Sequence, residues 1–92
     1  MERSEVYKAI DSERDYQNSR WNENTTISKN IHTLEDWYMY IEDYVNEAKH
    51  ILSREARQDA NPKALDILRK VSAMAVCAME AHGVEQRKGF ER

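Results

Sequence analysis

The sequence predicts an all-α protein, and two observations support this prediction. Only two of its 92 residues are glycines and one is a proline, whereas 34% are charged. This composition, rich in Ala, Glu, Lys and Arg, favours helix over sheet. No stretch alternates apolar and polar residues between turn signals, as a half-buried strand would. Because a chain of this length builds one small core, we predict a single helical domain over residues 1–92 with three main helices.

The first helix is predicted over residues 5–21. Apolar residues recur at helical spacing near its start, at Val6, Ala9 and Ile10. The segment then turns strongly polar, so we expect the helix to dock by its N-terminal half and its charged run Glu13-Arg14-Asp15 to face solvent. A polar loop is predicted over residues 22–32, because its Asn, Thr and Ser side chains compete for backbone hydrogen bonds. We expect His32, at the end of this loop, to be exposed to solvent.

The second helix, predicted over residues 34–56, is the clearest amphipathic helix of the chain. Thr33 and Asp36 form a variant of the capping box, with Asp where Glu or Gln is usual, and mark its start. Apolar residues then recur at steps of three and four: Leu34, Trp37, Tyr38, Ile41, Tyr44, Val45, Ala48 and Leu52. This stripe predicts the core face. We therefore interpret its aromatic rings as packing residues rather than as a base-stacking surface, whereas Tyr40 points away from the stripe.

The third helix is predicted over residues 62–82. Asn61 is the expected N-cap, Pro62 suits the first helical position, and Gly83 most easily adopts the left-handed C-terminal cap. We expect residues 84–92 to form a solvated tail.

Between residues 71 and 81 the third helix is apolar on nearly all sides. A three-helix domain has too little chain to bury every side of one helix, so we predict a symmetric homo-oligomer that associates through this helix. Small residues would let two such helices approach closely: Ser72, Ala73, Ala75 and Ala78. The alternative is a central helix that both other helices wrap within one chain. We interpret Cys77, in the same segment, as a buried core residue.

Composition also limits the partners and the location that we expect. A net charge of −3 supplies no broad positive field, so general nucleic-acid binding is not expected. The chain contains no run of about 18 apolar residues and starts without the apolar stretch of a signal peptide, so we expect neither membrane insertion nor secretion. A single cysteine suits a reducing compartment, and we predict a cytoplasmic location.

Several segments occur in an order that is typical of a known family. They are Ile10 to Gln17, Trp21, His32, Trp37, an acidic second helix, and residues 67–83. Over residues 6–83 this order resembles the small MazG-like proteins of bacteriophages, which belong to the all-α nucleotide pyrophosphohydrolases. In that family one helix carries E-E-x-x-E and the next carries E-x-x-D. The four carboxylates bind Mg²⁺ ions, which hold the triphosphate and activate water.

The resemblance places Asp43 and Glu47 on two acids of the first motif, with Tyr44 in place of the middle one. Both acids of the second motif are missing, and Lys70 replaces one of them. Asp66 lies one residue early, about 100° round the helix. An ammonium group at this site would repel a cation and pair instead with a carboxylate of the second helix. The resemblance therefore predicts the fold better than it predicts the reaction.

Three interpretations of these residues remain open. Glu42, Asp43 and Glu47 are solvated residues of an outer helix face, or Asp43 and Glu47 are metal ligands. In the third interpretation, a polar pocket holds a phosphate or a partner with the help of Arg69 and Lys70. No cofactor follows firmly from this pattern, and Mg²⁺ is the ion that it suggests.

We therefore expect a non-catalytic MazG-like phage protein that binds a nucleotide or a host protein in the host cytoplasm. A competing hypothesis is an active Mg²⁺-dependent nucleoside triphosphate pyrophosphohydrolase, in which the acids of the second helix and Asp66 rearrange around one ion. A third is an acidic inhibitor that places the second helix on a basic surface of a host enzyme, an interaction that salt would weaken steeply.

Overall fold

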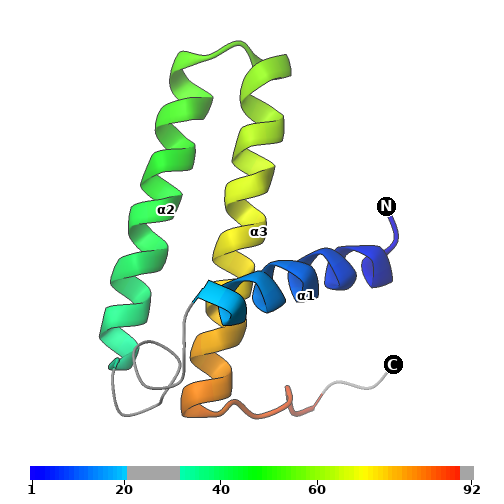
Figure 1. Ribbon diagram of the computed structural model, residues 1–92, viewed down its shortest axis with the longest axis vertical. Coiled ribbons are helices and arrows are strands. Elements are labelled where there is room, and N and C mark those ends of the chain that lie inside the picture. The colour runs from blue at the N-terminus through cyan, green and yellow to red at the C-terminus, as the bar shows by residue number, and fades with distance from the viewer. Residues whose placement is uncertain (21–31, 90–92) are drawn as a thin grey trace.

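The computed structural model describes residues 1–20 and 32–89, and every regular element within them is an α-helix. The helices are α1 (Arg3–Arg20), α2 (Leu34–Arg54) and α3 (Arg57–His82). α2 and α3 form a long antiparallel hairpin, and α1 crosses one face of it at a steep angle (Figure 1). The predicted all-α fold with three main helices is confirmed. The predicted loop lies outside the described residues except for His32.

The local signals at two helix ends are confirmed. At the start of α2, the Thr33 hydroxyl accepts a hydrogen bond from the Asp36 N–H, and the Asp36 carboxylate accepts one from the Thr33 N–H, both at 3.1 Å. This is the complete capping box, formed with the shorter acid. At the end of α3, Gly83 has a φ of 88° and donates its N–H to the Met79 carbonyl at 2.7 Å. A residue without Cβ adopts this conformation at little cost.

The start of α3 differs from the sequence prediction. The helix begins at Arg57, so Pro62 lies inside it and Asn61 is not the N-cap. The N-cap position is taken by Ala56, which makes no side-chain capping bond. Tertiary contacts account for the extra turn, because Ala60 is completely buried and Lys63 pairs with Glu55 across the α2–α3 connection at 2.6 Å. These contacts offset the backbone bond that proline cannot make.

The core lies at the end of the hairpin remote from the α2–α3 connection. Its buried residues are Trp37, Met74, Cys77 and Ala78, with Ile41 and Tyr44 packed against them. Burial of Cys77 is confirmed. The rest of the predicted α2 stripe is less covered than its spacing suggests: Leu34, Tyr38, Val45 and Leu52 are exposed.

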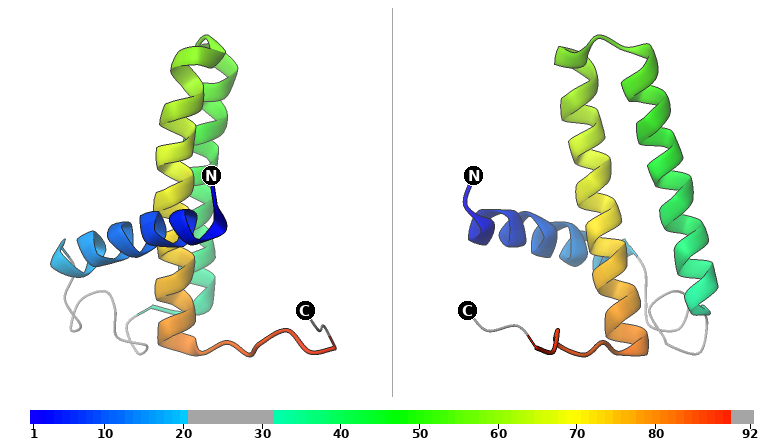
Figure 2. Two further views of the ribbon diagram at one scale, coloured as in Figure 1. Left: turned by 90° about the vertical axis from the view of Figure 1, so that its right-hand side faces the viewer. Right: turned by 180° about the vertical axis from the view of Figure 1, so that it is seen from behind.

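α3 presents three stripes, roughly 120° apart by the 100° step of a helix. One faces α2 and includes Ile67, Met74 and Ala78. A second faces α1 and includes Arg69, Ala73 and Glu80. Ala73 and Ala78 are thus buried within one chain, as in the single-chain alternative for this segment. The third stripe comprises Leu65, Leu68, Ser72, Ala75 and Met79, and no other described helix covers it (Figure 2).

Among the helices that the structure describes, none combines the length and the apolar character that crossing a membrane requires.

Candidate functional site

A polar cavity of about 260 Å³ opens between α1 and the α2–α3 hairpin. Its walls are formed by Glu13, Tyr16, Gln17 and Arg20 of α1, Tyr44 of α2, and Lys70 and Met74 of α3. The α1 members are spaced by three, four and seven residues, which places them on one face of that helix. α1 therefore docks by a polar face in its C-terminal half rather than by its N-terminal half as predicted.

The charged run of α1 is the clearest departure from the sequence prediction. Glu13 and Arg14 are buried instead of solvated, and only Asp15 remains exposed. The Arg14 guanidinium donates Nε to Glu80 Oε1 at 2.9 Å and Nη2 to Glu80 Oε2 at 3.0 Å. Its Nη1 donates to Asn18 Oδ1 at 2.7 Å. A bidentate ion pair of this kind compensates the burial of the cation, so Arg14 fixes α1 to α3.

Arg69, which the sequence assigns to ligand binding, is engaged in ion pairs. Its Nε donates to Glu13 Oε1 at 2.8 Å, and its Nη1 donates to Asp66 Oδ1 at 2.9 Å. The hydrogen bond that Arg69 donates to Glu13 is the main cause that raises the pKa of Arg69 above its ordinary value. Arg69 therefore neutralises Glu13 on the cavity wall and also pairs with the exposed Asp66.

Two cations remain at the cavity once Glu13 is neutralised. Arg20 lies in the last turn of α1 and Lys70 lies on α3, and both side chains are exposed. Neither forms an ion pair with another described residue; in particular, Lys70 does not pair with Asp43 or Glu47. The described residues at the cavity mouth therefore carry a local excess of positive charge, on a protein whose net charge is negative.

Gln17 supplies an unsatisfied acceptor. The residue is 4% exposed, and its Oε1 has no hydrogen-bond partner among the described residues. The other end of the amide is held weakly, because Nε2 donates to the Lys70 carbonyl at 3.4 Å. A buried acceptor without a partner costs roughly 1–3 kcal/mol. A ligand that donates an N–H or O–H here would recover part of that cost.

The predicted acidic residues of α2 are not part of this cavity. Glu42, Asp43 and Glu47 are exposed, and none of them lines it. Within residues 1–20 and 32–89, no three His, Cys, Asp or Glu side chains come together in a way that suits a metal ion. Tyr44, which directly follows the predicted ligand Asp43, is the α2 residue that lines the cavity.

His32 is not solvent-exposed as predicted. Its ring makes edge contacts with Trp37 and Tyr40 at centroid distances of 5.5 and 5.6 Å, and its carbonyl lies 3.2 Å from His82 Nε2. Tyr40 also meets Trp37 edge-on at 6.3 Å. These contacts close the open end of the hairpin over the core, so we assign these rings a packing role.

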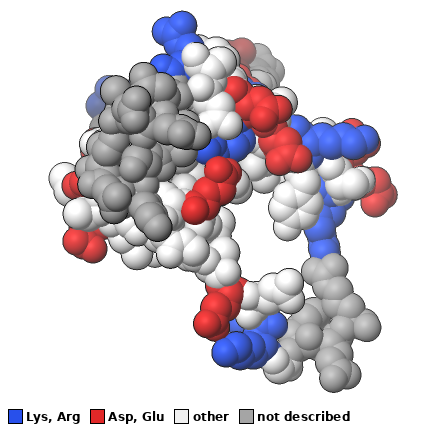
Figure 3. Space-filling view, turned by 60° about the horizontal axis from the view of Figure 1, so that its bottom comes forward, with Lys and Arg blue, Asp and Glu red and all other residues white. Residues whose placement is uncertain are grey.

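Sequence reasoning missed Tyr16, Gln17 and Arg20 as cavity residues, because a polar stripe on a short helix is ordinarily a solvated face. The available signal was the i, i+3, i+4 and i+7 spacing of Glu13, Tyr16, Gln17 and Arg20, which is the pattern of a contact face. On the side of the molecule that Figure 3 shows, acidic and basic side chains are interspersed. The coloured residues on this side therefore form no broad patch of a single charge sign.

Comparison of the chain with protein-family models, curated proteins and solved structures finds no match. The MazG-like resemblance therefore remains a prediction.

Proposed function

We propose that this protein is a non-catalytic binding protein whose polar cavity takes a nucleotide. The main support is the juxtaposition at one cavity of two cations, Arg20 and Lys70, two phenol rings, Tyr16 and Tyr44, and the unsatisfied oxygen of Gln17. Cations attract a phosphate, aromatic faces hold a base, and an amide oxygen accepts from a base or a sugar. A MazG-like phage origin and work in a host cytoplasm belong to the same proposal.

The size of the cavity narrows the ligand class. Its volume of about 260 Å³ is slightly below the roughly 300–1,000 Å³ of typical small-molecule sites. Only part of a nucleotide would be enclosed, with the remainder at the surface near the exposed Tyr16 ring. We therefore expect a nucleoside monophosphate or a part of a larger nucleotide to fit best, with modest affinity.

Binding is proposed in preference to hydrolysis because of where the charges lie. The cavity wall carries the ammonium of Lys70 where the resembled family would hold a cation with a carboxylate. Glu13, the one carboxylate among the described residues of this wall, is already paired with Arg69. Asp43 and Glu47 lie outside the cavity. An active Mg²⁺-dependent pyrophosphohydrolase remains the competing hypothesis, and under it Asp43→Asn abolishes turnover.

A host-protein partner is the second candidate function, because Glu42, Asp43 and Glu47 form an exposed acidic group on α2. Such a group would dock on a basic surface of a host enzyme. The affinity of that complex is expected to fall steeply with salt, and an affinity that does not change with salt would argue against this candidate.

The test is a ³¹P NMR titration of nucleoside mono- and triphosphates and cyclic nucleotides with the protein, with and without Mg²⁺. We expect shifted or broadened ligand signals without new phosphate peaks. Lys70→Gln should weaken binding by about tenfold or more, because it removes a charge-assisted contact. Lys8→Gln, which removes the same charge from the exposed part of α1, should leave binding unchanged. New pyrophosphate peaks would favour the hydrolase, and equal effects of the two variants, or no binding, would refute the cavity assignment.

A further inference from the structure

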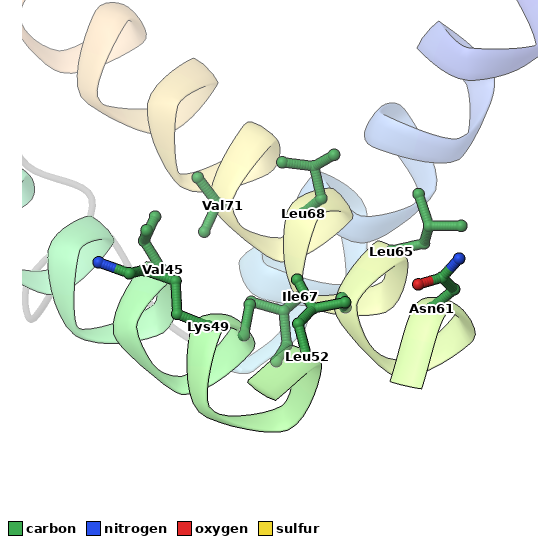
Figure 4. Close-up of a pocket in the computed structure, with 10 residues that line it drawn as sticks. Val45, Lys49, Leu52, Asn61, Leu65, Ile67, Leu68 and Val71 are labelled. Carbon is green, nitrogen blue, oxygen red and sulfur yellow. The ribbon is translucent and has the colours of Figure 1, made fainter. Parts of the chain in front are cut away.

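The side of the hairpin that α1 does not cover carries an apolar groove of about 410 Å³ (Figure 4). Val45, Lys49 and Leu52 line it from α2, and Ile67, Leu68 and Val71 line it from the opposing α3. Ile67 forms the floor, because it is buried between the two helices. The groove is therefore built on two rigid helices and does not involve the cavity proposed to bind the nucleotide.

Large apolar side chains surround this groove without a covering layer among the described residues. Leu65, Leu68 and Leu52 are 63%, 57% and 50% exposed. Seen from behind in Figure 2, α2 and α3 face the viewer with α1 on their far side. Single exposed leucines are ordinary on a protein surface, but a contiguous apolar groove on two adjacent helices marks an interface.

The exposed area of the chain is large enough to supply a stable dimer. The chain exposes 7492 Å², whereas a compact protein of its mass, 10.9 kDa, exposes roughly 5,600 Å². A standard interface removes about 800 Å² from each partner. The extended segment after Gly83 contributes to this exposed area as well.

The charge pattern beside the groove identifies the partner. Residues on the groove-side flank of α2 follow at steps of four and three: Tyr38, Glu42, Val45, Lys49 and Leu52. This stripe is self-complementary about Val45 when two copies of α2 run antiparallel. In that register Glu42 of each copy meets Lys49 of the other, and Tyr38 meets Leu52. Neither charged residue has an ion-pair partner among the described residues of its own chain.

We propose that the groove binds a second copy of this chain, with the two hairpins packed face to face and antiparallel about a two-fold axis near Val45. The result is a four-helix bundle of α2 and α3 from each copy, with α1 on its outer faces. Interface residues that recur at steps of three and four on both helices suit this packing. A two-fold axis brings the same surface of each copy into the interface. The third stripe of α3, from Leu65 towards Met79, extends the contact along the bundle.

This dimer retains the predicted self-association through α3 but changes the surface that makes it. The small residues Ala73 and Ala78 pack within the chain, and Leu65 and Leu68 provide the contact between copies. The cavity beside α1 stays accessible in this arrangement, so nucleotide binding and dimerisation can be measured and can fail independently.

The test is a charge swap read out by sedimentation equilibrium over a range of chain concentrations. Wild-type protein should dimerise, and Glu42→Lys or Lys49→Glu should each raise the dimer dissociation constant by about tenfold or more, because each change places two like-charge pairs across the axis. The double variant Glu42→Lys/Lys49→Glu should recover to within about threefold of wild type.

Glu47→Lys is the matched control, because the same substitution lies on the opposite side of α2. It should leave the dissociation constant unchanged, and circular dichroism should show that every variant remains helical. A wild-type chain that stays monomeric at millimolar concentration would overturn the proposal, and the groove would then accept a different protein or remain open. A double variant weaker than either single variant would equally overturn it, because the copies would not meet in the antiparallel register.

Discussion

The two faces of the α2–α3 hairpin reverse the usual distribution of polar and apolar residues. On the face that α1 crosses, the charged or amide side chains of Glu13, Arg14 and Gln17 are buried. On the opposite face, Leu65 and Leu68 are exposed. The buried charges are each paired with a residue of α3, whereas the exposed leucines have no covering helix among the described residues.

This difference shows that burial in a small helical protein depends on which elements are available to pack. α1 brings its own ion-pair partners to α3, so a polar face can be buried at limited cost. On the opposite face no third helix packs among the described residues, and apolar side chains there are exposed. We therefore expect the covered face to determine the stability of one chain and the uncovered face to determine its association.

The largest expected effect separates two neighbouring residues on α3. Ile67→Ala should lower the free energy of unfolding by about 2–3 kcal/mol, because Ile67 is buried between α2 and α3. Leu68→Ala should change it by less than about 0.5 kcal/mol in dilute protein, since Leu68 is 57% exposed. Urea denaturation at low chain concentration measures both. Equal losses for the two variants would mean that the groove face is already covered within one chain.

The second effect concerns the ion pair on the covered face. Glu80→Gln should lower the free energy of unfolding by about 1–2 kcal/mol, because it leaves the guanidinium of Arg14, 7% exposed, without its anion. The loss is smaller than for a fully buried pair, since the Glu80 side chain is half exposed. Glu85→Gln, which removes one member of an exposed ion pair with Lys88, is the control and should cost less than about 0.5 kcal/mol. If Glu80→Gln and Glu85→Gln lowered the free energy of unfolding equally, the ion pair with Glu80 would not offset the burial of Arg14.

The smallest expected effect is a pH dependence of stability that comes from Cys77. Its thiol is affected by the charges of the Arg14–Glu80 ion pair. Burial raises the pKa of the Cys77 thiol above its ordinary value of 9.0; Glu80 adds to the rise and Arg14 opposes it. The unfolded chain therefore loses this proton at lower pH than the folded chain. The contribution of the Cys77 thiol to the free energy of unfolding is complete below about pH 9. As the pH rises further this contribution is lost, with a slope of at most about 1.4 kcal/mol per pH unit.

Urea denaturation from neutral to alkaline pH measures this dependence. Cys77→Ala serves as the comparison, because it retains every lysine and tyrosine that also titrates at alkaline pH. The stability of wild-type protein should fall more steeply with pH than that of the variant. Parallel curves would show that the thiol is as accessible to water in the folded chain as in the unfolded one.

Part of the candidate site could be predicted from the sequence. The sequence predicts Lys70 as a site residue because its ammonium group replaces a carboxylate of the resembled family, and Lys70 lines the cavity. The sequence also predicts Arg69, but its guanidinium neutralises Glu13. Tyr16, Gln17 and Arg20 were missed because their side chains are polar on a polar helix. Their spacing places them on one helix face, but spacing alone does not distinguish a docked polar face from a solvated one.

Composition and helical periodicity by themselves determined the all-α fold, the capping box of Thr33 and Asp36, and the glycine cap at Gly83. These features depend on interactions within a few residues of one another, which a local pattern records. Only the tertiary structure decided that α3 begins before Pro62, that Glu13 and Arg14 are buried, and that α1 leaves one face of the hairpin uncovered. The contacts responsible join residues far apart in the chain, 56 positions for Arg69 and Glu13 and 66 for Arg14 and Glu80. No local pattern specifies which distant side chain will offset the desolvation of a charge.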